Sequence, residues 1–99
     1  MQLSSPRTAA SGEKGVSFPG LECWNAMTKV ATVAAEVDKK RVLCRISLEV
    51  LIDKFGALEE EPMQSVARQR SAIHDAARKL IERELYEEDD SVLIRACDL

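Results

Sequence analysis

Apolar side chains recur at helical spacing between Pro62 and Leu85. They occupy positions three, four and seven residues apart, at Met63, Val66, Ile73, Ala77, Leu80 and Ile81. On a helical wheel of about 100° per residue, these six side chains fall within an arc of roughly 100°. Arg70 projects into the middle of that arc and His74 onto its edge. The pattern predicts one long amphipathic helix, on which the rest of the chain packs.

A period of two replaces the helical period between Met27 and Ser47. Two alternating runs flank the polar break Asp38-Lys39-Lys40, with apolar side chains at Ala31, Val33, Ala35 and Val37 and then at Val42, Cys44 and Ile46. This pattern predicts a β-hairpin. Val16 and Phe18, just before Pro19-Gly20, predict a short edge strand followed by a turn.

Ser47 is a suitable N-cap for a short helix, because its hydroxyl can accept from an exposed backbone amide. The helix would carry apolar residues at positions i, i+3, i+4 and i+7 and would end at Gly56. After the acidic run that follows Leu85, residues 92–97 predict a last strand with apolar residues on both faces. We expect this strand inside the sheet, beside the hairpin.

The predicted order is therefore β-β-α-α-β, an α+β fold with a small antiparallel sheet and two helices packed on one face. The chain has 99 residues, 45% of them hydrophobic, so it can form a single domain with a small core. Residues 1–15 are rich in Ser, Ala, Gly and charge, which predicts a disordered leader. Residues 16–99 are expected to form the domain.

The charge and cysteine content restrict the functional classes. A net charge of -3 argues against a general binder of polyanions. The three cysteines lack CxxC spacing, and no signal segment opens the chain, so we expect reduced thiols and a cytoplasmic location. No apolar run approaches the roughly 20 residues of a membrane span. No cofactor is expected.

Arg70 is the most informative charged residue. A guanidinium inside an apolar arc must either reach solvent or meet a carboxylate, because burial without a partner costs several kcal/mol. The favoured interpretation is a structural ion pair with Asp98 or Glu49, Asp98 being preferred. The alternative is an anion site, which the planar guanidinium fork would suit.

Cys44, His74 and Cys97 are the residues from which a reactive site could be assembled. A zinc site normally shows closely spaced ligands, and these three are far apart in sequence, so no metal is expected. A Cys–His nucleophile stays open as an alternative, because such pairs meet in space. The favoured interpretation is packing, since a free cysteine among apolar residues behaves as a small hydrophobe.

A basic cluster lies at the predicted hairpin tip, formed by Lys39, Lys40 and Arg41 together with Arg45. It could contact nucleic acid, although a solubilising role at the turn is favoured and nucleic acid is not the expected partner.

The chain resembles a small bacterial family known as domain of unknown function 1488. The resemblance spans about Phe18 to Leu99 and rests on the runs AEVDKKRVLCRISLEVLIDKFG, RQRSAIHDAARKLIE and SVLIRACDL. The family features are filled here by Cys44, Ile46, Ser47, Phe55, Gly56, Arg70, Ile73 and Asp98. Lys39 departs from the pattern, since the family usually has Gly after the turn Asp. The resemblance implies a bacterial source and a compact α+β fold, and it carries no catalytic residue.

Three functions therefore compete. The leading hypothesis is a non-enzymatic interaction or regulatory module that binds a protein partner or a second copy of itself, because part of an apolar sheet face would remain uncovered. The alternatives are weak nucleic-acid binding through the hairpin tip and a small enzyme that uses a Cys/His pair.

Overall fold

The computed structural model describes residues 15–99, and it confirms the α+β class. The predicted leader lies outside the described residues, apart from Gly15. The strands are β1 (Val16–Ser17), β2 (Glu22–Asn25), β3 (Val30–Val37), β4 (Lys40–Ser47) and β5 (Val92–Ile94). The helices are α1 (Leu48–Phe55), α2 (Pro62–Arg68) and α3 (Arg70–Glu82), followed at the C-terminus by a 3-10 turn, Ala96–Asp98.

The sheet is mixed, which corrects the expectation of a purely antiparallel one. β1 and β2 both pair antiparallel with β3, and β3 pairs antiparallel with β4. β5 lies beside the hairpin as predicted and pairs parallel with β4, with Arg45 opposite Leu93. It forms an edge of the sheet rather than an inner strand, and it ends at Ile94 because the chain turns at Ala96–Asp98, which corrects the predicted position and length. The three helices between β4 and β5 bring the chain back to the end of the sheet where β4 starts, so β5 must run in the same direction as β4.

The hairpin turn consists of Asp38 and Lys39, between the paired residues Val37 and Lys40. Both turn residues have positive φ, 51° and 72°. Two-residue turns of this kind match the twist of the strands, but they favour Asn, Asp or Gly. Lys39 therefore holds a left-handed conformation in which a side chain costs about 1–2 kcal/mol.

The core lies between one face of the sheet and the helices. The inward residues of the hairpin are those predicted from the alternation, and each is at most 7% exposed: Ala31, Val33, Ala35, Val37, Val42, Cys44 and Ile46. They pack with the buried face of α3, formed by Ile73, Ala76, Ala77, Leu80 and Ile81. The apolar stripe thus defines the packing of the domain.

Local signals fix the limits of α1. The Ser47 hydroxyl accepts from the Val50 amide at 3.3 Å, and Gly56 ends the helix with φ of 64°. Both ends agree with the sequence prediction.

The long helix expected from Pro62 to Leu85 is instead two helices that break at Gln69. There ψ is 23°, far from the helical value near -42°. In one continuous helix, Arg70 would sit in the middle of the apolar stripe. With the break at Gln69, Arg70 lies outside this stripe: its side chain is 47% exposed and faces β2. The last turn also ends early, at Glu82, because Glu84 takes a positive φ of 57°.

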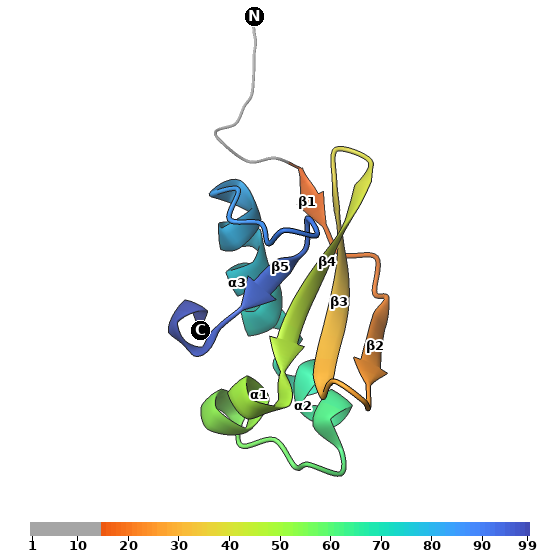
Figure 1. Ribbon diagram of the computed structural model, residues 1–99. Helices are drawn as coiled ribbons and strands as arrows, with labels where there is room; N and C mark the ends of the chain where they lie inside the picture. Colours follow the sequence, from red (N-terminus) through yellow and green to blue (C-terminus); the bar gives the residue numbers. More distant parts are fainter. Residues whose placement is uncertain (1–14) are drawn as a thin grey trace, which may run out of the picture.

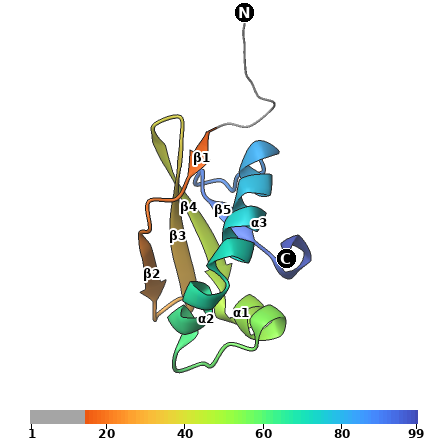
Figure 2. The same ribbon diagram turned by 180° about the vertical axis from the view of Figure 1, so that it is seen from behind.

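The molecule has two layers (Figures 1 and 2). In Figure 1 the sheet faces the viewer with α3 behind it, and Figure 2 shows α3 in front of the sheet. α1 and α2 lie near the end of the sheet where β4 terminates. No helix covers the other side of the sheet within residues 15–99, and none of the described helices is long and apolar enough to span a bilayer.

Candidate functional site

The side of the sheet against which no described helix packs is here called the open face. Strand alternation places on it Cys23, Thr32, Ala34, Glu36, Arg41, Leu43, Arg45 and Leu93. Leu43 lies in the middle of β4 and is 46% exposed, whereas its neighbour across the strands, Ala34, is 5% exposed. The open face is therefore apolar at its centre.

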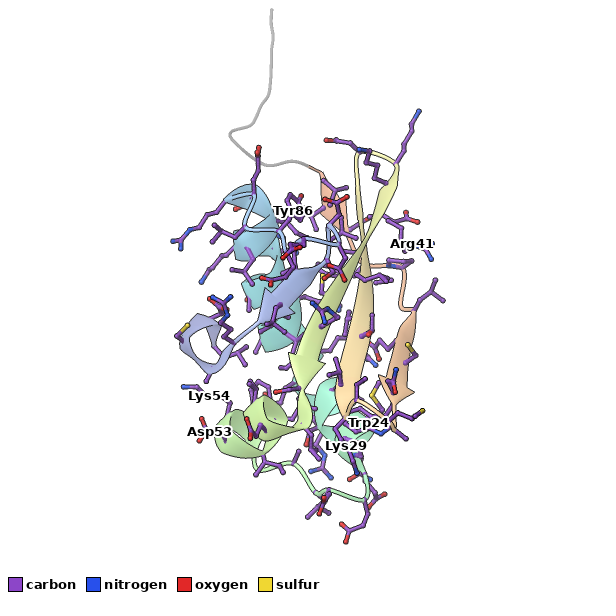
Figure 3. All side chains as sticks on the ribbon, in the orientation of Figure 1. Trp24, Lys29, Arg41, Asp53, Lys54 and Tyr86 are labelled. Atoms are coloured by element: carbon purple, nitrogen blue, oxygen red, sulfur yellow. The ribbon has the colours of Figure 1, made fainter. Side chains whose placement is uncertain are left out.

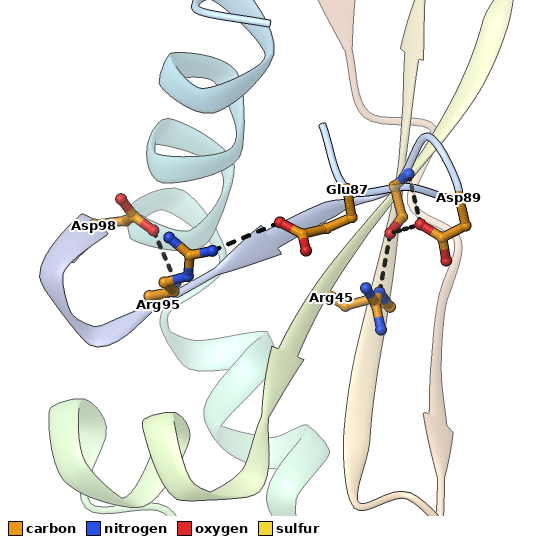
Figure 4. Close-up of polar contacts among 6 residues, drawn as sticks. Arg45, Glu87, Asp89, Arg95 and Asp98 are labelled. Atoms are coloured by element: carbon orange, nitrogen blue, oxygen red, sulfur yellow. Dashed lines mark hydrogen bonds and ion pairs between the residues drawn. The ribbon is translucent and has the colours of Figure 1, made fainter. Parts of the chain in front are cut away.

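Arg45 borders this apolar centre and is held by the loop before β5 (Figure 4). Its Nε donates to the Ser91 hydroxyl at 3.1 Å, and that hydroxyl donates to Asp89 Oδ1 at 2.5 Å. The Ser91 hydroxyl and backbone amide lower the pKa of Asp89, so this carboxyl stays ionised. The contacts use only the Nε of Arg45, which leaves its two terminal nitrogens without a hydrogen-bond partner in the described part of the chain.

Asp98 does not pair with Arg70, which corrects the sequence prediction. Its Oδ2 accepts from the Arg95 backbone amide at 2.8 Å, in the C-terminal 3-10 turn. The Arg95 side chain lies 3.6 Å from Glu87 (Figure 4). Glu49, the other proposed partner, is exposed and makes no ion pair within residues 15–99. The Asp98 carboxylate, predicted to pair with Arg70, therefore stabilises the C-terminal turn instead.

Arg70 instead pairs with Glu22 of β2 through two hydrogen bonds. Nε donates to Oε2 at 2.7 Å and Nη2 donates to Oε1 at 2.9 Å. The hydrogen bond from Arg70 lowers the pKa of Glu22, against the opposing effect of burial. The same contact raises the pKa of Arg70. This bidentate geometry fastens β2 to the start of α3 and occupies the guanidinium fork that an external anion would need.

His74 follows one turn after Arg70 and packs against the segment between β1 and β2. Its ring stacks on Phe18 with centroids 3.8 Å apart, and the Arg78 guanidinium lies 5.8 Å from the same Phe18 ring. His74 Nε2 is buried and has no hydrogen-bond partner among residues 15–99, and burial lowers the pKa of the imidazole. Arg70, His74 and Arg78 thus form one stripe of α3 that holds the N-terminal edge of the sheet.

The three residues considered for Cys/His chemistry are not joined by any hydrogen bond in the described part of the protein. Cys44 is fully buried in the core, and burial raises its pKa to about 12, so the thiol stays protonated. Cys97 is exposed in the C-terminal turn, and all three cysteines are free. Residues 15–99 contain no group of three or more His, Cys, Asp or Glu arranged to hold a metal.

The hairpin tip carries fewer free positive charges than its sequence suggests. The Arg41 guanidinium contacts Glu36 at 3.2 Å, and Arg45 is bound to Ser91 on the open face. Only Lys39 and Lys40 remain as exposed cations at the tip. Beside them lies a cavity of about 610 Å³, lined by Val37, Asp38, Lys40, Arg41, Val42, Tyr86 and Asp90.

Sequence reasoning missed Glu22 because β2 was not predicted, and it placed Phe18 in an edge strand without its contact to His74. The alternation in Glu22-Cys23-Trp24-Asn25 is short, although the i, i+4, i+8 spacing of Arg70, His74 and Arg78 could have indicated a polar stripe with a common partner. Ser91 and Asp89 were also missed, since the acidic run that follows Leu85 was considered only as the link to the last strand.

Comparison with known proteins agrees with the fold. Residues 16–94 match the family described as "Protein of unknown function (DUF1488)". A crystal structure of a protein of unknown function from this family, from Shewanella loihica PV-4, superposes with a TM-score of 0.75 at 20% identity. The match covers 83% of this chain and 94% of that chain. No curated protein sequence matches the chain.

Proposed function

The chain belongs to the DUF1488 family, whose function is unknown, and we propose that it is a non-enzymatic interaction module of the bacterial cytoplasm. The partner is another protein, which binds the open face. A single observation carries this proposal: Leu43, at the centre of an uncovered sheet face, exposes 46% of its surface. Leu43 does not stand alone, because half-buried Leu93 lies diagonally across from it on β5, and contiguous apolar side chains on an uncovered face mark docking surfaces.

The charges around Leu43 indicate the chemistry of the partner. Arg45 lies two residues further along β4 on the same face, and Leu93 lies opposite Arg45 on β5. The terminal nitrogens of Arg45 have no hydrogen-bond partner within residues 15–99, so they are available to a carboxylate. A complementary partner therefore presents an apolar side chain over Leu43 and Leu93 and an acidic residue beside Arg45.

The surroundings of the reactive candidates support a non-enzymatic role. The Cys44 thiol is inside the core with a pKa of about 12, which disfavours the thiolate needed for nucleophilic attack. Nucleic-acid binding through the tip is less well supported, because Glu36 pairs with Arg41 and Asp90 lies at the neighbouring cavity wall.

A site-specific crosslink tests this proposal. A photoreactive amino acid at position 43 should capture a partner from lysate, whereas the same group at exposed Lys79 on α3 should not. The captured protein is then purified and titrated against the wild-type chain and Leu43→Asp. We expect Leu43→Asp to weaken binding at least tenfold and Lys79→Ala to leave it unchanged. Equal affinity of wild type and Leu43→Asp would refute the open face as the docking surface.

A further inference from the structure

The outer edge of β4 near the hairpin turn has unpaired backbone groups. The Ala34 amide donates to the Leu21 carbonyl at 2.9 Å, so Ala34 points its backbone groups away from β4. Groups alternate along a strand, and Ala35 therefore points toward β4, where it is opposite Val42. Ala35 and Val42 therefore form a hydrogen-bonded pair, in which the N–H of each residue donates to the C=O of the other. Arg41, the residue before Val42, must then direct its N–H and C=O outward.

β5 does not reach this part of β4. Its pairing begins at Cys44 and ends at Ile46, and no other described strand lies outside β4. The backbone of Arg41 is therefore at an open sheet edge, between the hairpin turn and the first residue of β5. Such an edge is a template for an added strand.

The cavity of about 610 Å³ flanks this edge, and its two ends differ in charge. The hairpin end carries Lys40 and, in the adjoining turn, Lys39; these two cations outnumber the one acid there, Asp38. The other wall comes from the loop after α3, with Tyr86 and Asp90. Figure 3 shows Tyr86 between the end of α3 and the hairpin. Val37 and Val42, each 7% exposed, contribute the apolar part of the lining.

We propose that a second copy of this chain occupies this edge, through antiparallel pairing of the two β4 strands about a two-fold axis at Arg41. The Arg41 N–H of each copy donates to the Arg41 carbonyl of the other. A two-fold interface needs a self-complementary surface. Antiparallel pairing supplies one here, because it carries the lysine tip of each copy toward the Asp90 wall of the other.

The Arg41 side chains would face each other across the axis, which alone would be unfavourable. Each is already paired with its own Glu36 at 3.2 Å, and this contact offsets the repulsion. Only a few residues of each strand take part, so the interface is small and the dimer is weak and salt-sensitive. The two-fold axis also places both open faces on the same side, which joins two apolar centres into one extended surface.

The test compares two substitutions at one position. Arg41→Pro removes the outward N–H, and proline is tolerated on an edge strand where that N–H has no internal partner. Arg41→Ala removes the side chain and keeps the N–H. In sedimentation velocity up to millimolar concentration, we expect wild type and Arg41→Ala to dimerise with constants within threefold, and Arg41→Pro to dimerise at least tenfold more weakly. Dimerisation of Arg41→Pro at the wild-type level, or a wild-type chain that stays monomeric, would overturn the proposal.

A second measurement covers the case in which Arg41→Pro fails to fold. Hydrogen exchange of the Arg41 amide in the wild-type chain, followed by NMR, should slow at least threefold from micromolar to millimolar concentration. The backbone amide of exposed Lys79 on α3 serves as the reference, because α3 takes no part in the proposed pairing. An Arg41 exchange rate independent of concentration would refute the pairing. Leu43→Asp keeps the Arg41 backbone intact, so loss of partner binding in that variant separates the open-face proposal from this one.

Discussion

Truncating Ile73 tests whether the apolar stripe of α3 is the centre of the fold. Ile73 is completely buried between α3 and the sheet. Ile73→Ala removes three carbons, which amounts to about 2.4 kcal/mol of lost transfer free energy at about 0.8 kcal/mol per group. The cavity left behind adds to this loss, so we expect a total of about 3–4 kcal/mol, within the usual 2–5 kcal/mol.

This loss is large for a domain of this size, whose total stability should be roughly 5–15 kcal/mol. At about 4–8 °C per kcal/mol, Tm should fall by at least 12 °C. Urea unfolding followed by circular dichroism measures the change, with the slope on denaturant held constant as a check on two-state behaviour.

Ile52→Ala on α1 is the matched control. It deletes the same atoms from a helix, but Ile52 is 45% exposed, so its loss should be roughly 1.3 kcal/mol, about half of the 2.4 kcal/mol transfer free energy and without a core cavity. Equal losses for the two substitutions would refute the packing of α3 against the sheet.

Four further predictions concern single residues. Lys39→Gly should stabilise the chain by about 1 kcal/mol in the same urea assay, because glycine relieves the positive φ of 72°. Glu22 has a lowered pKa when paired with Arg70, so its contribution to the free energy of unfolding is complete above about pH 4.5 and is lost as pH falls through the folded-state pKa. Glu22→Gln should therefore make stability depend less on pH in the acid range. His74 also has a lowered pKa, so the unfolded chain takes up its proton first and stability should decline below about pH 6.5, which His74→Phe should prevent. With a thiol reagent at pH 8 the two exposed cysteines should react in the native protein and Cys44 only after unfolding, so three fast-reacting thiols would contradict its burial.

Sequence reasoning succeeded where structure depends on near neighbours. The limits of α1 follow from Ser47 and Gly56, which act within one turn of the helix. The inward face of the hairpin follows from strict alternation around Asp38 and Lys39, and the turn forms although it lacks glycine.

Elements that depend on distant contacts were not predictable in the same way. The break at Gln69 accompanies a contact between Arg70 and Glu22, which are 48 residues apart. Periodicity alone assigned Arg70 to the apolar arc, because a helical wheel assumes that the helix is continuous. The direction of β5 depends on how three helices return the chain to the sheet, and no local pattern encodes that path.

The same distinction applies to the candidate surfaces. Sequence alternation alone puts Leu43 on the solvent side of β4, but its role depends on whether another element covers it. Only the arrangement of all the described elements shows that α3 packs on one face and leaves the other uncovered. The edge at Arg41 depends likewise on the register of β5. Its pairing with β4 starts at Cys44 rather than three residues earlier, at Arg41. A β5 extended to Arg41 would close the edge, and of the two surfaces proposed for association the open face alone would remain. The short last strand therefore creates the second surface, and the Arg41→Pro and Leu43→Asp variants separate the two.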